Sequence, residues 1–403
     1  MNLIQLAVGF VPKRKEASFS LHFYCIGVLL LFFYSFTQID LSLTITKVAF
    51  LQPIQQAFQY IGYFNRPLSS VLYLGILVIL FGGFILLLRD AFRGKIAGRT
   101  VWFLIFFTTI LLIFSYNSFS YDLFNYIFDA KIITNYHENP YLKKALDYPG
   151  DPMLSFMRWT HRVYPYGPTW LVFTVPLSLI GFQFFVVTFF LFKIAIAACF
   201  LGTAYFLQKI AGKLHSESAV QTLVFFALNP LVIIESLVSG HNDIVMLFFA
   251  ILSLWYLIEL KYIRSSIAFL FSVGIKFVTG SLLPVYLYIV YKIKKGQTPD
   301  WEKVIICMTA IMIIAMLLAA YRTNFQPWYF LYALPFIALA VRKKYFVFPA
   351  VIFSFCSLLQ YLPYLFLGNY DPPVPAILFN MFLISGIVSV IVGLVLRLKT
   401  SRS

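Results

Sequence analysis

Long apolar runs, separated by short polar segments, recur along the whole chain. Runs such as 19–37, 70–88 and 182–207 contain almost no charged side chains. The hydrocarbon core of a bilayer is about 30 Å thick, so a helix needs about 20 apolar residues to cross it. The pattern predicts an all-α polytopic membrane protein in which residues 1–403 form one transmembrane domain.

Basic residues lie mainly in the short segments between these runs, and they predict an orientation. Lys13–Lys15 precede the first run, Arg89–Arg99 follow the second, and Arg397–Arg402 follow the last. Short loops rich in Lys and Arg remain in the cytoplasm. We therefore expect about eleven to thirteen spans, with both termini cytoplasmic.

Four segments depart from simple spans. Segment 38–69 is expected on the outer face, where QPIQQAFQYIGYF could form an interfacial helix. Segment 169–181 is short, and either crosses or turns back. Segment 266–291 joins two basic segments, which favours a hairpin of two short helices that meet near Lys276. A further span is expected from 327 to 342.

Segment 118–168 is the only long stretch without membrane-type hydrophobicity. It contains Asp122, Asp129, Arg158, His161 and Arg162. A loop of about fifty residues between spans is uncommon unless it has a function. The predicted orientation makes it extracytoplasmic, and we expect it to be the catalytic loop.

Composition supports the membrane assignment and excludes other classes. The chain is 61% hydrophobic and 11% charged, with a mean hydropathy of +0.86 and a net charge of +16. The positive charge fits contact with membrane lipid headgroups. The sequence shows no basic face interleaved with exposed aromatics, so nucleic-acid binding is not expected. The first apolar run is too long for a cleavable signal peptide. The four cysteines lie far apart, which argues against a disulfide or a zinc site.

Polar side chains from distant segments are predicted to meet at the outer face. Carboxylates beside cations suit a reaction on a lipid phosphate, because a base can deprotonate a hydroxyl while cations stabilise the leaving phosphate. In addition to those of the long loop, these side chains are Glu235, His241, Asn242, Asp243, Arg322, Asn324, Gln326 and Trp328.

Most of these residues also have a structural explanation. Asp129 could pair with Lys131, and the two arginines of the loop could anchor an interfacial helix in headgroups. His241 and Asp243 could cap the next span, and Trp328 could be an interfacial anchor. Lys193, in the middle of a run, is expected to be structural.

Five motifs, in order over residues 115–345, carry a resemblance to a known family. They are Asp122-x-x-x-Tyr126-x-x-Asp129 with Asn139-Pro140-Tyr141, then Tyr166-Gly167-Pro168, LNPLVIIESLVSGHND at 228–243, GIKFVTGSLLP at 274–284 and PWYFLYALP at 327–335. The chain resembles GT-C membrane glycosyltransferases, most closely the polyprenyl-phosphate-mannose-dependent mannosyltransferases of bacterial envelopes.

The resemblance implies a GT-C bundle and inverting transfer of a hexose, with mannose favoured, from a polyprenyl-phosphate sugar to an extracytoplasmic glycan or glycolipid. It implies Asp122 as general base, Asp129 as the alternative, and a cell (inner) membrane location; the sequence indicates no divalent metal and no cofactor other than the lipid-phosphate sugar donor. The implied substrate-binding residues are Tyr126, Asn139, Tyr141, Arg158, His161, Arg162, Tyr166, His241, Asn242, Asp243, Lys276, Arg322 and Trp328.

Two other functions remain open at this point. A lipid-linked sugar flippase or other transporter would typically show paired halves with broken helices, whereas this chain concentrates its polar groups on one face. An acyl or phosphoethanolamine transferase is a further alternative. A phosphoethanolamine transferase would need a metal cluster with a nucleophilic Ser or Thr, and the spacing of the residues does not show one.

Overall fold

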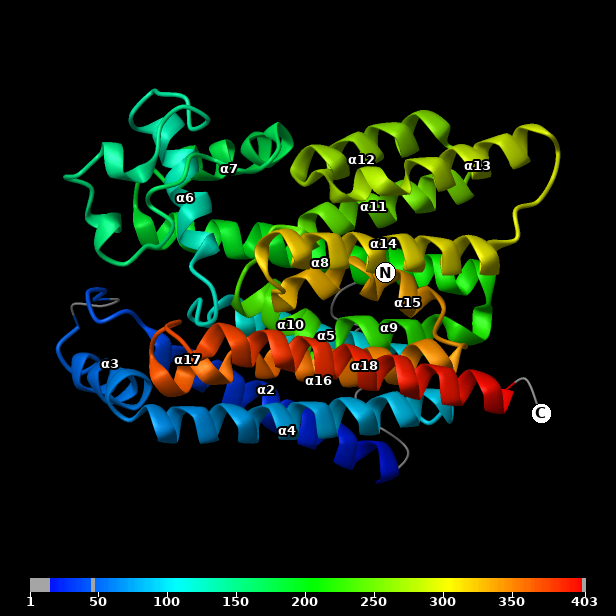
Figure 1. The fold of residues 1–403 in the computed structure, drawn as a ribbon, viewed down its shortest axis with the longest axis horizontal. Helices are drawn as coiled ribbons and strands as arrows, with labels where there is room; N and C mark the ends of the chain where they lie inside the picture. Colours follow the sequence, from blue (N-terminus) through cyan, green and yellow to red (C-terminus); the bar gives the residue numbers. More distant parts are fainter. Residues whose placement is uncertain (1–14, 45–47, 401–403) are drawn as a thin grey trace.

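The computed structural model describes residues 15–44 and 48–400. Within these ranges the chain is helical and contains no strand, and most of the long helices lie side by side along the longest axis (Figure 1). The predicted all-α membrane fold is confirmed. The basic residues 13, 14 and 402, used to orient the chain, lie outside the described residues.

Six helical segments in the described ranges are long and apolar enough to cross a membrane. They are α2 (Lys15–Ser35) with η1 (Phe36–Gln38), α4 (Arg66–Phe92), α8 (Phe185–Leu214), α14 (Trp301–Thr323), α16 (Lys344–Leu359) with α17 (Leu362–Leu367), and α18 (Val374–Thr400).

A seventh span is broken in its middle. The helix α9 (Ala219–Ala227) is followed by α10 (Pro230–Ile233) and the π-turn η6 (Ile234–Val238), at an angle of 53°. Pro230 has no N–H to continue the helix, and the Asn229 side chain accepts from the Leu231 N–H at 3.0 Å. The new helix therefore starts in a different direction.

Four further apolar helices are only 13 to 16 residues long: α5 (Gly98–Ile113), α7 (Pro168–Ile180), α11 (Asp243–Ile258) and α12 (Tyr262–Ile275). At 1.5 Å per residue each is about 20–24 Å long, less than the hydrocarbon thickness. For this reason length and composition support six or seven spans in the described part of the chain, not the eleven to thirteen expected.

The span expected over 327–342 is not a continuous helix. It consists of η8 (Pro327–Tyr332) and the six-residue α15 (Leu334–Leu339), and Pro335, which has no backbone N–H to donate, lies at the start of the second segment. Segment 266–291 contains the end of α12, then η7 (Phe277–Leu282) and most of α13 (Leu283–Lys294).

The long polar segment contains α6 (Asp122–Thr134), the short turns η3 (Ala145–Asp147) and η4 (Pro152–Ser155), and irregular chain. It lies at one end of the bundle, on the left of Figure 1, near α3 (Gln52–Gln59) and η2 (Tyr60–Phe64). The connection between α13 and α14 lies at the opposite end.

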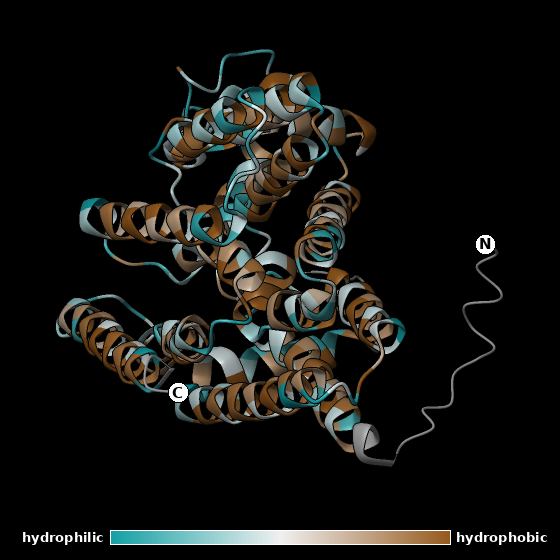
Figure 2. Ribbon diagram, turned by 90° about the vertical axis from the view of Figure 1, so that its right-hand side faces the viewer, coloured by the Kyte–Doolittle hydropathy of each residue, from teal (hydrophilic) through white to brown (hydrophobic). Residues whose placement is uncertain are grey.

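The broken span forms the centre of the molecule. Every residue from 222 to 247 is buried. The surrounding helices expose apolar side chains such as Val71, Ile110 and Phe379, and hydrophobic colouring covers their lengths in Figure 2. Polar groups in the 222–247 segment are therefore enclosed on all sides, and each needs a partner.

Candidate functional site

The site begins at Asp122, where the long polar segment becomes helix α6. Its N–H donates to Ser120 Oγ at 3.1 Å, and its carboxylate lies in the first helical turn, where negative charge is favoured. The side chain is 15% exposed, whereas the neighbouring His241 is fully buried. Asp122 is thus the point at which this buried region meets solvent.

His241 lies between two carboxylates. Its Nδ1 is 3.5 Å from Asp122 Oδ2, and its Nε2 is 3.3 Å from Glu235 Oε2. One face of the imidazole stacks on Trp328, with ring centres 4.2 Å apart. Gly240, with φ +67°, supplies the left-handed backbone that turns the chain from η6 towards α11.

These surroundings set the charges of the three titratable groups. Burial alone would lower the pKa of His241, but Asp122 and Glu235 raise it to about 9. The pKa of Asp122 is lowered, because His241 and Lys276 outweigh the effect of burial. Burial, with the charge of Asp122, raises the pKa of Asp129 to about 8. At neutral pH, Asp122 is therefore charged and Asp129 is protonated.

A second set of contacts extends the site towards α7 and α12. Tyr126 donates from its hydroxyl to Asn242 Oδ1 at 3.3 Å, and its ring packs edge-on against Tyr166. Lys276 Nζ lies 2.7 Å from Asp243 Oδ2 and 5.5 Å from the centre of the Tyr166 ring. These contacts bring residues from four of the five motifs into one cluster.

Besides the two ring nitrogens of His241, three buried polar atoms of this cluster have no hydrogen-bond partner in the described chain. They are Asn242 Nδ2, Asp243 Oδ1 and Trp170 Nε1, and the Trp170 ring packs edge-on against Tyr126. An unsatisfied buried polar group costs about 1–3 kcal/mol. Groups of this kind suit a site that binds a polar ligand.

The motif residues Asn139 and Tyr141 hold the loop against the cluster. Asn139 Oδ1 accepts from the Tyr141 N–H at 2.9 Å, and the Tyr141 hydroxyl donates to the Tyr166 carbonyl at 3.2 Å. The Gly167 N–H donates to the Ile275 carbonyl at 3.1 Å, so the YGP and GIKF motifs are in direct contact.

The other expected phosphate ligands lie on loop aromatics or at the surface. Arg158 lies over the Tyr121 ring at 5.1 Å, and Arg162 over the Trp159 ring at 4.2 Å. The His161 ring is 6.4 Å from that of Trp159. Arg322 is exposed in the last turn of α14.

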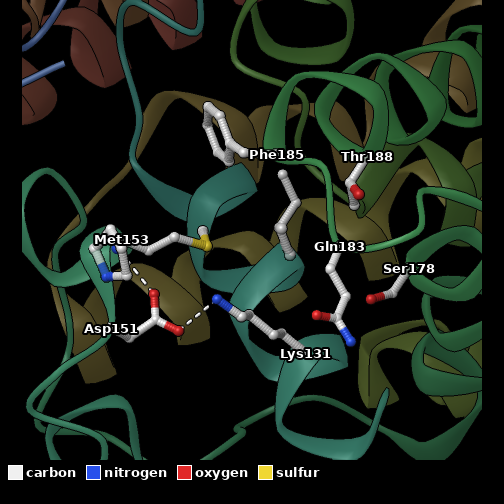
Figure 3. A pocket seen from close by; sticks show the side chains of 9 residues that line it. Lys131, Asp151, Met153, Ser178, Gln183, Phe185 and Thr188 are labelled. Atoms are coloured by element: carbon white, nitrogen blue, oxygen red, sulfur yellow. Dashed lines mark hydrogen bonds and ion pairs between the residues drawn. The ribbon is translucent and has the colours of Figure 1, made fainter. Parts of the chain in front are cut away.

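A pocket of about 170 Å³ lies beside Lys131 (Figure 3). Lys131 pairs with Asp151 at 2.5 Å. The ion-pair partner of Lys131 is therefore Asp151 and not Asp129. Lys131 follows Asp122 by nine residues, which at about 100° per residue places it on the opposite face of α6. The pocket is therefore separate from the cluster around His241.

Three residues of the site, Trp170, Glu235 and Tyr361, are not among the expected ligands. Glu235 was noted as a polar residue of the outer face, and an acid in an apolar run is itself a signal of function. Tyr361 donates to both Glu235 oxygens, at 2.9 and 3.1 Å, and nothing in its sequence context indicates this. Lys193 has the structural role expected of it, since it donates to Ser115 O and Oγ, both at 2.9 Å.

Comparison with protein families identifies the chain. The family model of alpha-(1→6)-mannopyranosyltransferases, N-terminal domain, matches residues 25–292, more than half of the chain. Searches of curated proteins and of solved structures gave no significant match. The resemblance to GT-C polyprenyl-phosphate-mannose-dependent mannosyltransferases is confirmed: this multi-pass membrane protein is a mannosyltransferase and belongs to the alpha-(1→6)-mannopyranosyltransferase family.

Proposed function

We propose that the protein transfers mannose from polyprenyl-phosphate mannose to a hydroxyl of an extracytoplasmic glycan or glycolipid, with inversion at C1. Asp122 accepts the hydroxyl proton, the acceptor oxygen forms a bond to C1, and the bond from C1 to the phosphate oxygen breaks. The lipid phosphate leaves with the electron pair. Family membership supports mannose as the sugar and carbon 6 as the position of the acceptor hydroxyl.

The observation that carries this proposal is the partial exposure of a charged Asp122 beside a buried imidazole. A general base must be unprotonated and within reach of the substrate proton. The lowered pKa of Asp122 leaves it unprotonated at neutral pH, and its partial exposure leaves it accessible to an acceptor hydroxyl. Asp129 is the weaker candidate, because its raised pKa leaves it protonated there.

Lys276 is the cation that we assign to the departing phosphate. Its side chain is 16% exposed, and an ammonium group has three N–H donors, of which the contact with Asp243 uses one. The unpartnered Asn242 Nδ2 and Trp170 Nε1 are further donors for sugar or phosphate oxygens. The aromatic faces of Tyr126 and Tyr166 provide surfaces for the sugar ring.

Purified protein in vesicles, supplied with radiolabelled polyprenyl-phosphate mannose and a mannose-containing acceptor, tests the proposal. Wild type and Asp129→Asn should transfer label, and Asp122→Asn should be slower by about 10² or more. Transfer that survives in Asp122→Asn would assign the base elsewhere. Label that crosses the bilayer without transfer to any acceptor would instead support the flippase.

A further inference from the structure

Glu235 is an unusual residue for its position. It lies in the π-turn η6 of the broken span, and its side chain is completely buried. A buried carboxylate is costly unless it is paired and hydrogen bonded. Its partners are the Tyr361 hydroxyl on one side and His241 Nε2 on the other. An apolar residue would fill this place without that cost, so the carboxylate requires an explanation.

The contacts form one continuous chain from the protein interior to the solvent-facing acid. Tyr361 binds Glu235, Glu235 contacts His241, and His241 contacts Asp122. The Trp328 ring covers one face of the imidazole and restricts its rotation. An imidazole between two carboxylates is held in its protonated form, and the two ring nitrogens of His241 lie 3.5 and 3.3 Å from the nearest carboxylate oxygens.

We infer that Glu235 and Tyr361 are positioning residues for mannosyl transfer, which act through His241 to hold the Asp122 carboxylate charged and in place. Glu235 and Tyr361 touch no substrate in this role. This inference rests on the proposed function, because it assumes that Asp122 is the base.

The groups that face this chain of contacts must be considered in a pH experiment. Tyr126, Asp129 and Lys276 lie around Asp122, and Asp243 and Tyr73 lie near Glu235. In wild type, His241 should lose its proton as the pH rises through about 9, so the rate should fall there. Removal of the Glu235 charge leaves only one carboxylate to hold that proton.

The test compares the pH dependence of kcat/KM in wild type, Glu235→Gln and Tyr361→Phe. In Glu235→Gln the alkaline limb should move to lower pH by about one unit and kcat should fall about tenfold, with KM for the donor nearly unchanged. Tyr361→Phe should move the limb in the same direction by less.

Two matched controls exclude a general effect of altered buried groups. Asp90 is a buried acid that accepts from Ser20 Oγ at 2.8 Å, and Tyr286 is a buried tyrosine that donates to the Ala250 carbonyl at 3.0 Å. Asp90→Asn and Tyr286→Phe should leave the pH profile unchanged.

An unchanged alkaline limb in Glu235→Gln would overturn the inference, and so would an equal shift in Asp90→Asn. If Glu235→Gln does not yield monodisperse protein, the limb of Tyr361→Phe decides in the same way. Loss of transfer in Asp122→Asn with a wild-type profile in Glu235→Gln would refute only this inference. Full transfer in Asp122→Asn would refute the proposed base itself.

Discussion

Asp122 and Asp129 lie seven residues apart on the same face of α6, yet they differ in charge at neutral pH. Asp122 contacts His241 and interacts electrostatically with the positive charge of Lys276, so the pKa of Asp122 is lowered. Burial of Asp129 and, to a lesser extent, the negative charge of Asp122 raise the pKa of Asp129 to about 8. The sequence predicts both acids near the outer face, whereas the difference in their charge follows only from the folded structure.

Asp129→Asn should therefore retain transfer within a few-fold of wild type and stabilise the protein at high pH. The folded state raises the Asp129 pKa from 3.8 to about 8, so it binds the proton more tightly than the unfolded state does. Stability is then lost as pH rises through this window, and asparagine removes that loss. Thermal unfolding in detergent at pH 6 and pH 9 measures the difference. A variant less stable than wild type at pH 9 would contradict this assignment.

Lys276→Met should weaken donor binding, but it also leaves Asp243 without its cation. Breaking one partner of a buried pair typically costs about 3–5 kcal/mol. The double variant Lys276→Met/Asp243→Asn removes both charges and should recover much of the stability. We expect its KM for the lipid donor to remain at least about tenfold above wild type. A folded double variant with normal KM would exclude Lys276 as a phosphate ligand.

At the scale of elements, the start of α7 and the end of α12 are held together by closely packed backbones. The Gly167 N–H donates to the Ile275 carbonyl, and a Cβ on Gly167 would collide with the Gly274 carbonyl oxygen. A Cβ on Gly274 would collide with Thr169 Oγ1. This junction fixes Tyr166 beside Lys276, and explains why glycine occurs in both motifs.

Gly167→Ala should reduce both stability and transfer, because the colliding atom belongs to the backbone and cannot move aside. Gly274→Ala should be rescued in part by Thr169→Ala, which removes the colliding oxygen. Gly280→Ala is the matched control, since its nearest side-chain atom would lie 3.6 Å away. The melting temperature and the transfer rate of the four variants measure how far each substitution lowers stability and activity. Equal behaviour of Gly167→Ala and Gly280→Ala would argue against the junction.

Sequence reasoning was more successful for long elements than for short ones. The apolar runs 70–88 and 182–207 predict α4 and α8, because hydrophobicity over about 20 residues is a strong signal. The segment of the short helix α7 is open to a crossing or a turn back, because a run of 13 residues does not reveal where its helix ends. Contacts such as Tyr361 with Glu235 join residues 126 positions apart, and no local pattern encodes them.

At the scale of the whole molecule, the site and the long polar segment lie towards one end of the bundle, and the α13–α14 connection lies at the other (Figure 1). The basic residues Lys292, Lys294 and Lys295 cluster near that connection. By the positive-inside rule we expect this end to face the cytoplasm. We therefore expect the site to open on the extracytoplasmic side.

Cysteine labelling in intact cells or sealed vesicles tests this orientation. Leu142 is 76% exposed in the long polar segment, and Thr298 is exposed in the α13–α14 connection. In a variant without the four native cysteines, an impermeant maleimide added outside cells should label Leu142→Cys. It should label Thr298→Cys only after permeabilisation. The reverse pattern would place the site on the cytoplasmic face.

The short helices have a consequence for the membrane itself. The helices α7 and α11 begin, and α12 ends, at site residues or beside them, and each is about 20–24 Å long against a hydrocarbon core of about 30 Å. Where such a helix faces lipid, either the bilayer thins beside it or the reaction centre lies beneath the headgroup plane. A lipid carrier then reaches the centre by lateral diffusion within its leaflet. The elasticity of the bilayer would thereby contribute to the reaction barrier, and lipid chain length would tune the rate.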